Sequence, residues 1–182
     1  FKLLKNIKQF SSNNLSLKLQ ENLNDQARIS KNWIASQEII NQNKKTHFLK
    51  THNALCSING NNFTDKFNTS AAIYVVRDPR NLITSLSHHY ELSLEKAFIF
   101  LANKRKIIFP LNIEEKGKNV ENREDFNFLG DWSTHYQSWK NINFCPIKII
   151  KYEDCLNDVQ KVFVSTLDFL SQFFKFKFDN KK

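Results

Sequence analysis

Two kinds of apolar segment alternate along the chain. One kind is a short run of apolar residues, and the other is a longer stretch with the spacing of an amphipathic helix. The run at 71–76 is nearly unbroken, as in a strand buried on both faces. Residues 147–152 are predicted to form another buried strand, and a shorter candidate strand covers 46–51. The helical spacing predicts helices over residues 1–10, 33–40, 79–90, 96–104, 130–140 and 157–174. The polar stretches 59–70 and 116–125 are predicted to be loops, and alternating phenylalanines at 174–178 favour an edge strand.

Strands that alternate with helices indicate an α/β fold, with a parallel sheet covered by helices on both faces. The strand at 71–76 is followed by a clear helix start, because Asp78 suits the N-cap and Pro79 the first helical position. The chain has 182 residues, of which 41% are hydrophobic. This is enough for one domain with its own core, and we assign residues 1–182 to a single domain.

Polar side chains stand at the ends of the three predicted strands. They are Lys50-Thr51-His52, Arg77-Asp78-Pro79-Arg80 and Tyr152-Glu153-Asp154. In open parallel sheets, ligands bind outside the carboxyl ends of the strands. The three ends are therefore predicted to converge on one crevice.

Arg77 is the first candidate for binding an anion in that crevice. It precedes a helix N-terminus, and Ser85 follows eight residues later on the same helix. A guanidinium and a hydroxyl can bind one phosphate together, and the helix dipole favours the negative charge. Alternatively, Asp78 and Pro79 only start the helix, and Arg77 makes a local ion pair.

His52 is the candidate general base, because an ordinary imidazole has a pKa of about 6.5 and can accept a proton near neutral pH. A structural role for a histidine that follows a strand is the alternative. The other histidines have no spacing to cysteines or carboxylates that would indicate a metal site. We therefore predict no metal.

The formal net charge is +9. Such a charge suits a nucleic acid, an anionic membrane surface or a phosphorylated nucleotide, although a lysine-rich composition explains it equally well. The chain has only 3 glycines and 3 cysteines, and the cysteines have no paired spacing. A disulfide framework is thus not expected, and we predict a reducing, cytoplasmic location. No run of about eighteen apolar residues occurs, so no membrane span is predicted.

The motifs also resemble a known family, the cytosolic-type PAPS-dependent sulfotransferases. The resemblance begins with Lys50-Thr51-His52, followed by Tyr74-Val75-Val76-Arg77-Asp78-Pro79-Arg80-Asn81 and Ser85. The pattern Gly130-x-Trp132-x-x-His135-x-x-x-Trp139 and then Lys151-Tyr152-Glu153-Asp154 follow in the family's order. Each motif is short, but together they span residues 48–174.

The resemblance implies a P-loop-NTPase-like fold, with three α/β/α layers and a central parallel sheet. It implies that the chain transfers a sulfonate from PAPS to a hydroxyl or amine of a small-molecule, carbohydrate or lipid acceptor. Arg77 and Ser85 would bind the 3′-phosphate of the donor, and Tyr152 would lie near the nucleotide. His52 would be the base, with Lys50 beside it stabilising charge at the sulfonate. Trp132 and Trp139 are expected to be packing residues, and the resemblance assigns no role to His135.

Two motifs of the family are missing. No Lys-Ser-Gly or Lys-Thr-Gly occurs, although the family's phosphosulfate loop should precede His52, and the C-terminal Arg-Lys-Gly…Gly-Asp-Trp segment is also absent. We expect that the chain is truncated at both ends, without the first strand and its loop, and that it transfers sulfonate poorly on its own. A catalytically inactive relative is the alternative.

Two other functions remain open. A P-loop nucleotide kinase has a related architecture but needs a glycine-rich loop ending in Gly-Lys-Ser/Thr, which the chain does not contain. A basic module that binds nucleic acid would suit the charge. However, the lysines are dispersed and are not interleaved with aromatic residues, so we predict no nucleic-acid partner. The sequence does not indicate the oligomeric state.

Overall fold

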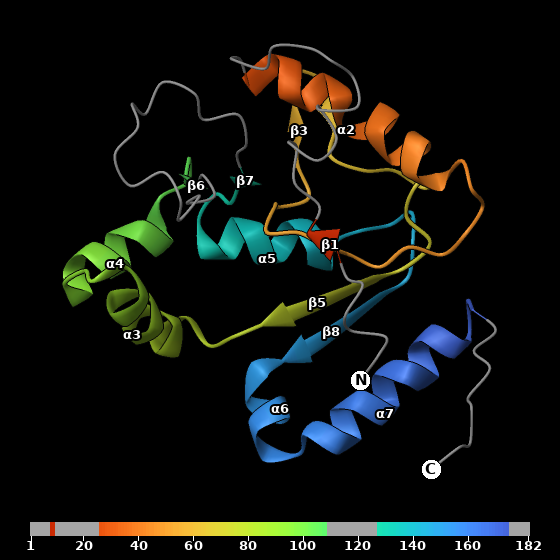
Figure 1. The fold of residues 1–182 in the computed structure, drawn as a ribbon. Coiled ribbons are helices and arrows are strands. Elements are labelled where there is room, and N and C mark those ends of the chain that lie inside the picture. Colours follow the sequence, from red (N-terminus) through yellow and green to blue (C-terminus); the bar gives the residue numbers. More distant parts are fainter. Residues whose placement is uncertain (1–7, 10–25, 109–126, 175–182) are drawn as a thin grey trace.

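The structure is a computed structural model that describes residues 8–9, 26–108 and 127–174 (Figure 1). Its helices are α2 (Gln26–Asn41), α3 (Pro79–Tyr90), α4 (Leu94–Ala102), α5 (Trp132–Lys140), α6 (Tyr152–Asn157) and α7 (Val159–Ser171). Its strands are β1 (Lys8–Gln9), β2 (Leu49–Lys50), β3 (Ser57–Ile58), β4 (Asn61–Asn62), β5 (Ala72–Val76), β6 (Ile107–Ile108), β7 (Asn127–Phe128) and β8 (Ile147–Lys151).

Two pairs of strands are parallel, as an α/β fold requires. The longer pair joins β5 to β8, with Ala72 opposite Ile147 and Val76 opposite Lys151, and the shorter pair joins β1 to β2. The pairs β3–β4 and β6–β7 are antiparallel. Within the described residues these four pairs are separate, so a continuous central sheet stays a prediction.

The strand β5 is covered on one face only. Its Tyr74 ring lies 6.0 Å from the ring of Tyr136 and 6.4 Å from that of Trp139, both on α5. On the opposite face Ile73 and Val75 are 40% and 56% exposed. The prediction that this strand is buried on both faces was therefore wrong for the described residues. Figure 1 shows α5 and α7 on opposite sides of the strand pair, and α7 packs against β8.

Side-chain caps define where several helices begin. The N-cap residues Asp78, Ser93, Asp131 and Asp158 each accept a hydrogen bond from a backbone N–H of the first helical turn. Such caps satisfy amide donors that otherwise have no partner within a helix. The predicted helices that these caps begin are confirmed, and α2 confirms the one predicted around Trp33.

Other local predictions had mixed outcomes. The helix predicted over 1–10 is wrong at Lys8–Gln9, which form a strand because their backbone pairs with β2. The remainder of that prediction, the loop at 116–125 and most of the strand at 174–178 lie outside the described residues. The loop predicted over 59–70 begins with a hairpin, where Asn59 and Gly60 both have positive φ between β3 and β4. Two adjacent residues in this conformation match the twist of a tight hairpin.

The buried aromatic core connects α2, the segment after β4, and α5. The Phe63 ring packs edge-on against Trp33 at 5.3 Å and against Trp139 at 6.4 Å. The buried Gln37 side chain donates to the carbonyls of Trp33 and Phe63, so its polar amide is hydrogen-bonded inside this core. The core therefore fixes α5, the helix on which much of the candidate site depends.

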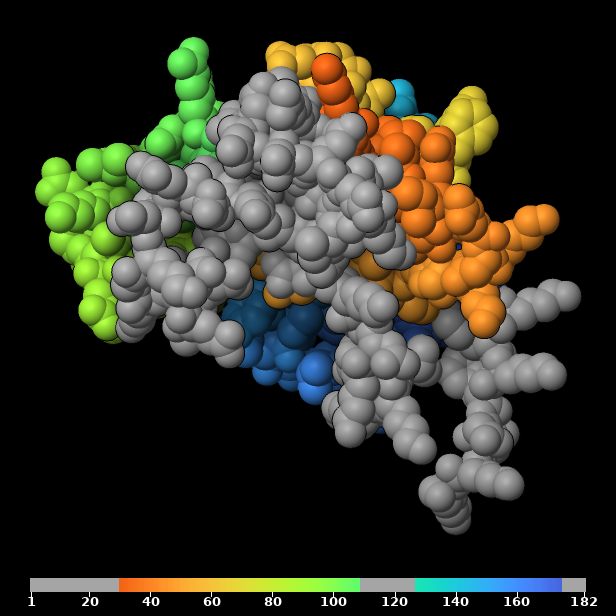
Figure 2. All heavy atoms as spheres, turned by 45° about the horizontal axis from the view of Figure 1, so that its top comes forward, coloured from red at the N-terminus to blue at the C-terminus, as the bar shows by residue number. Residues whose placement is uncertain are grey.

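Figure 2 shows the green helix α4 at one edge of the molecule and the orange region of α2 at the other. Leu94, Phe98 and Ile99 of α4 are all more than half exposed.

None of the described helices is both long enough and apolar enough to cross a membrane.

Candidate functional site

Arg77 lies just beyond β5, half-buried among side chains of other segments. Its guanidinium is 4.7 Å from the centre of the Tyr152 ring, a cation–π contact, and its backbone carbonyl accepts a hydrogen bond from Trp132 Nε1 at 3.2 Å. The Nε atom of Arg77 is buried and has no hydrogen-bond partner within the described part of the chain. A buried donor without an acceptor is costly, so this atom marks a place where an external anion would be favourable.

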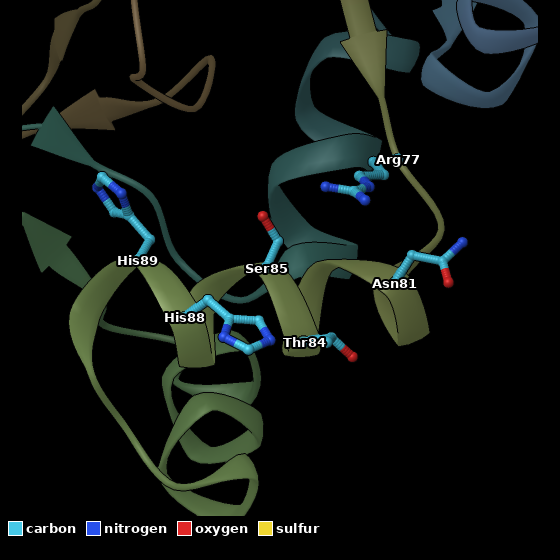
Figure 3. A pocket seen from close by; sticks show the side chains of 6 residues that line it. All are labelled: Arg77, Asn81, Thr84, Ser85, His88 and His89. Atoms are coloured by element: carbon cyan, nitrogen blue, oxygen red, sulfur yellow. The ribbon is translucent and has the colours of Figure 1, made fainter.

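The guanidinium of Arg77 borders a pocket of about 560 Å³ (Figure 3). The pocket is lined by Arg77, Asn81, Thr84, Ser85, His88 and His89. In Figure 3 the side chains of Arg77 and Ser85 lie on the same side of α3 and point toward the same space. The tertiary structure thus brings together the two residues predicted to bind one phosphate, one from the end of β5 and one from α3.

The N-terminus of α3 is less available to an anion than the sequence indicated. The backbone N–H of Arg80 donates to Asp78 Oδ1 at 2.8 Å, and the N–H of Asp78 donates to Glu153 Oε1 at 3.1 Å. Hydrogen bonds from Arg80 lower the pKa of Asp78 to about 2, so its carboxylate is charged at neutral pH. The pocket must therefore attract an anion mainly with side chains.

The ion pair foreseen as an alternative role for Arg77 is made by a different arginine. The Arg80 side chain pairs with Asp78, while Arg77 makes no salt bridge to any residue that the structure describes. The positive charge of Arg77 thus has no carboxylate partner there. This arrangement favours the anion-binding role of Arg77 over the structural one.

His52 and Lys50 lie at the end of β2, at the molecular surface. Burial of part of the ring, followed by the charges of Lys50 and His135, lowers the pKa of His52 from its ordinary value. The imidazole is therefore neutral near pH 7 and able to accept a proton. Neither residue belongs to the lining of the Arg77 pocket in the described structure, and the same is true of Tyr152.

Side chains of the helix α5 contact the backbone at both Arg77 and His52. Its His135 Nε2 lies 3.1 Å from the backbone carbonyl of His52, and Trp139 Nε1 donates to the carbonyl of Asn53 at 2.9 Å. Trp139 is also a core residue, as expected, but the hydrogen bonds of both tryptophans were not foreseen. The regular spacing of ring residues in the motif at 130–139 was the only signal in the sequence.

The described residues contain no cluster suited to a metal ion, and burial makes the thiol of Cys56 unreactive. No group of three or more histidine, cysteine, aspartate and glutamate side chains is present there. Cys56, Cys145 and Cys155 are free, and burial raises the pKa of the Cys56 thiol to about 11. A thiol with so high a pKa is a poor nucleophile at neutral pH.

A comparison with models of known protein families agrees with the pattern of motifs. The family model described as the sulfotransferase domain matches residues 4–177, nearly the whole chain. No curated protein matches the sequence.

Proposed function

The chain belongs to the sulfotransferase domain family, and on this premise we propose that it transfers a sulfonate from PAPS to a hydroxyl or amine acceptor, with His52 as the general base. The family implies an α/β P-loop-like fold, with which the parallel pairs are consistent. The three-layer arrangement around one central parallel sheet is part of the proposal. A cytoplasmic location is also part of the proposal, and the three free cysteines favour it.

The observation that carries the proposal is the setting of Arg77, whose side chain lines the pocket and whose buried Nε has no partner among the described residues. A phosphate in the pocket would accept hydrogen bonds from the guanidinium of Arg77 and from the Ser85 hydroxyl. The face of Tyr152 holds the guanidinium in place meanwhile. These groups fit the 3′-phosphate, the part of PAPS that distinguishes it from common adenine nucleotides.

The donor supplies an activated sulfonate, and the residues of this chain orient it and move a proton. The acceptor oxygen or nitrogen forms a bond to sulfur as the bond between sulfur and the donor phosphate breaks. His52 takes the acceptor proton, and Lys50 stabilises negative charge on the sulfonate oxygens. The electrons of the broken bond leave with adenosine 3′,5′-bisphosphate, so the step balances without a metal or a redox partner.

The rate of this chain alone should be low. A lysine from a phosphosulfate loop would neutralise the leaving phosphate, but the sequence contains no Lys-Ser-Gly or Lys-Thr-Gly. Binding of the bisphosphate depends on Arg77 and Ser85, which the chain does contain. Binding is therefore a better first test than turnover.

The test is thermal unfolding of the chain with adenosine 3′,5′-bisphosphate, using AMP as the matched control without the 3′-phosphate. At a hundredfold excess over its Kd, a ligand that binds only the native state stabilises it by about 2.7 kcal/mol. We expect this response from the bisphosphate but not from AMP, and we expect Arg77→Ala and Ser85→Ala to weaken it. Equal responses to both nucleotides, or none to either from a folded chain, would contradict the proposed donor site.

A further inference from the structure

One face of α5 presents three nitrogen-bearing rings to the backbone of distant segments. Trp132, His135 and Trp139 are three and four residues apart, a spacing that places side chains on the same side of a helix. Their ring nitrogens contact the carbonyls of Arg77 at 3.2 Å, His52 at 3.1 Å and Asn53 at 2.9 Å, respectively. The same helix thus contacts the backbone of the proposed base and that of the proposed phosphate-binding arginine.

The hydrogen bonds of His135 define which of its ring nitrogens carries the proton. Its Nε2 faces the carbonyl of His52, which can only accept, so Nε2 must be protonated. Burial lowers the pKa of His135, so the ring is neutral and Nδ1 has no proton. The hydroxyl of Tyr74 lies 2.9 Å from Nδ1 and must therefore donate to it.

Tyr74 is well suited to this role. Burial, with a smaller contribution from Tyr136, raises the pKa of Tyr74 to about 12, so its hydroxyl keeps its proton at neutral pH. Tyr74 lies on β5, three residues before Arg77. The chain of hydrogen bonds thus runs from β5 through His135 on α5 to the backbone of His52 after β2.

We propose that His135 is a positioning residue of the transfer reaction: as the Nε2–H tautomer, with Tyr74 donating to its Nδ1, it fixes the backbone of His52 relative to the strand that carries Arg77. This inference rests on the proposed function. His135 contacts the base only through its backbone, so it is not itself a catalytic residue. Trp132 makes the corresponding contact to the carbonyl of Arg77, so α5 carries both contacts, three residues apart.

A pair of matched variants separates positioning from simple structural support. In His135→Gln the amide nitrogen can take nearly the place of Nε2 and donate to the same carbonyl. In His135→Asn the side chain is one carbon shorter, and the amide cannot reach it. Both replacements are neutral amides of similar polarity, so a general loss of stability should affect them alike.

The first measurement is the steady-state kinetics of sulfonate transfer by the enzyme and by the two variants. A misplacement of about 1 Å can lower a rate about 10²-fold. We expect kcat of the asparagine variant to fall by up to that factor while its KM for PAPS stays within about twofold, and the glutamine variant to recover most of the loss. Equal kcat values for wild type and the asparagine variant would overturn the inference.

The second measurement does not depend on turnover. Nitrogen-15 NMR of the histidine rings in the 182-residue chain should find His135 protonated at Nε2 and not at Nδ1. Tyr74→Phe should shift the Nδ1 resonance, which loses its donor, and leave the proton on Nε2, which still faces the His52 carbonyl. The carbonyl carbon shift of His52 should change in the asparagine variant and much less in the glutamine variant. A proton on Nδ1 of His135, or an unchanged His52 carbonyl in the asparagine variant, would refute the inference even if the enzyme is active.

The two proposals fail in distinguishable ways. If the wild-type protein neither binds the bisphosphate nor transfers sulfonate, the proposed function is wrong. His135 then loses its catalytic context, and the inference that it positions a base is wrong too, although the NMR result still decides the hydrogen-bond chain. If the wild type is active and the asparagine variant matches it, only the positioning inference is wrong.

Discussion

Replacing Arg77 by methionine should leave the unliganded protein at least as stable as the wild type while abolishing its response to adenosine 3′,5′-bisphosphate. Methionine retains a long apolar side chain in the half-buried position but removes the guanidinium. The prediction separates the two roles that the sequence left open for this residue. A structural arginine stabilises the fold when nothing is bound, whereas an arginine kept for a ligand need not.

The expected change follows from two opposing contributions. Removing the guanidinium loses its contact with the Tyr152 ring, worth about 0.5–1 kcal/mol at a site near solvent. It also removes a buried Nε that has no partner among the described residues, and such an atom costs about 1–3 kcal/mol. The free energy of unfolding should therefore stay the same or rise by up to about 2.5 kcal/mol.

Urea unfolding of the chain without ligand measures the first effect, and thermal unfolding with the bisphosphate measures the second. Arg80→Met is the matched control, because it removes an arginine three residues away that is already paired with Asp78 and whose side chain is 88% exposed. Ion pairs between solvent-exposed side chains are screened by water and contribute little to stability, so this control should keep both its stability and its response to the bisphosphate. A loss of more than about 1 kcal/mol in Arg77→Met would refute the reasoning, because Arg77 would then be a structural residue.

Three further predictions test the site and its supports. Trp139→Phe should lower the free energy of unfolding in urea by about 1–3 kcal/mol, because the buried Asn53 carbonyl loses its donor, and a loss below about 0.5 kcal/mol would argue against that bond. The pH profile of kcat/KM for sulfonate transfer should have its acid inflection below pH 6.5, because burial and the charge of Lys50 lower the pKa of His52, and an inflection above this value would exclude His52 as the base. Stability should fall as the pH drops below 6.5, since burial lowers the native pKa of His135 and the unfolded chain binds the proton first. Urea midpoints of His135→Gln should show a shallower pH dependence, and a curve as steep as that of the wild type would rule out His135 as a source.

The sequence was informative wherever a structure depends on residues that are close along the chain. The strands predicted at 71–76 and 147–152 contain β5 and β8, although Tyr152 begins α6, and the start of α3 is where Asp78 and Pro79 predict it. An N-cap side chain accepts a hydrogen bond from an amide only two or three residues away, so a cap can be predicted from the local sequence. The hairpin at Asn59-Gly60 was equally local, and its dipeptide is a strong signal that could have been used.

The sequence could not show which faces are covered. An apolar strand is expected to be buried on both sides, yet Val75 is more than half exposed. The strand at Lys8–Gln9 is a similar case, since its backbone partner β2 lies about forty positions later along the chain. Burial and pairing depend on contacts between segments, which periodicity within one segment does not encode.

The sequence by itself determined the family and the candidate residues, because the motifs list the side chains that the chemistry needs in the family's order. The tertiary structure alone decided how they are arranged. It left Arg77 without a carboxylate partner in the described residues and gave that partner to Arg80. It also linked α5 to the site through hydrogen bonds between residues 55, 83 and 86 positions apart. Such hydrogen bonds form only when the core has brought the segments together, so no local pattern in the sequence predicts them.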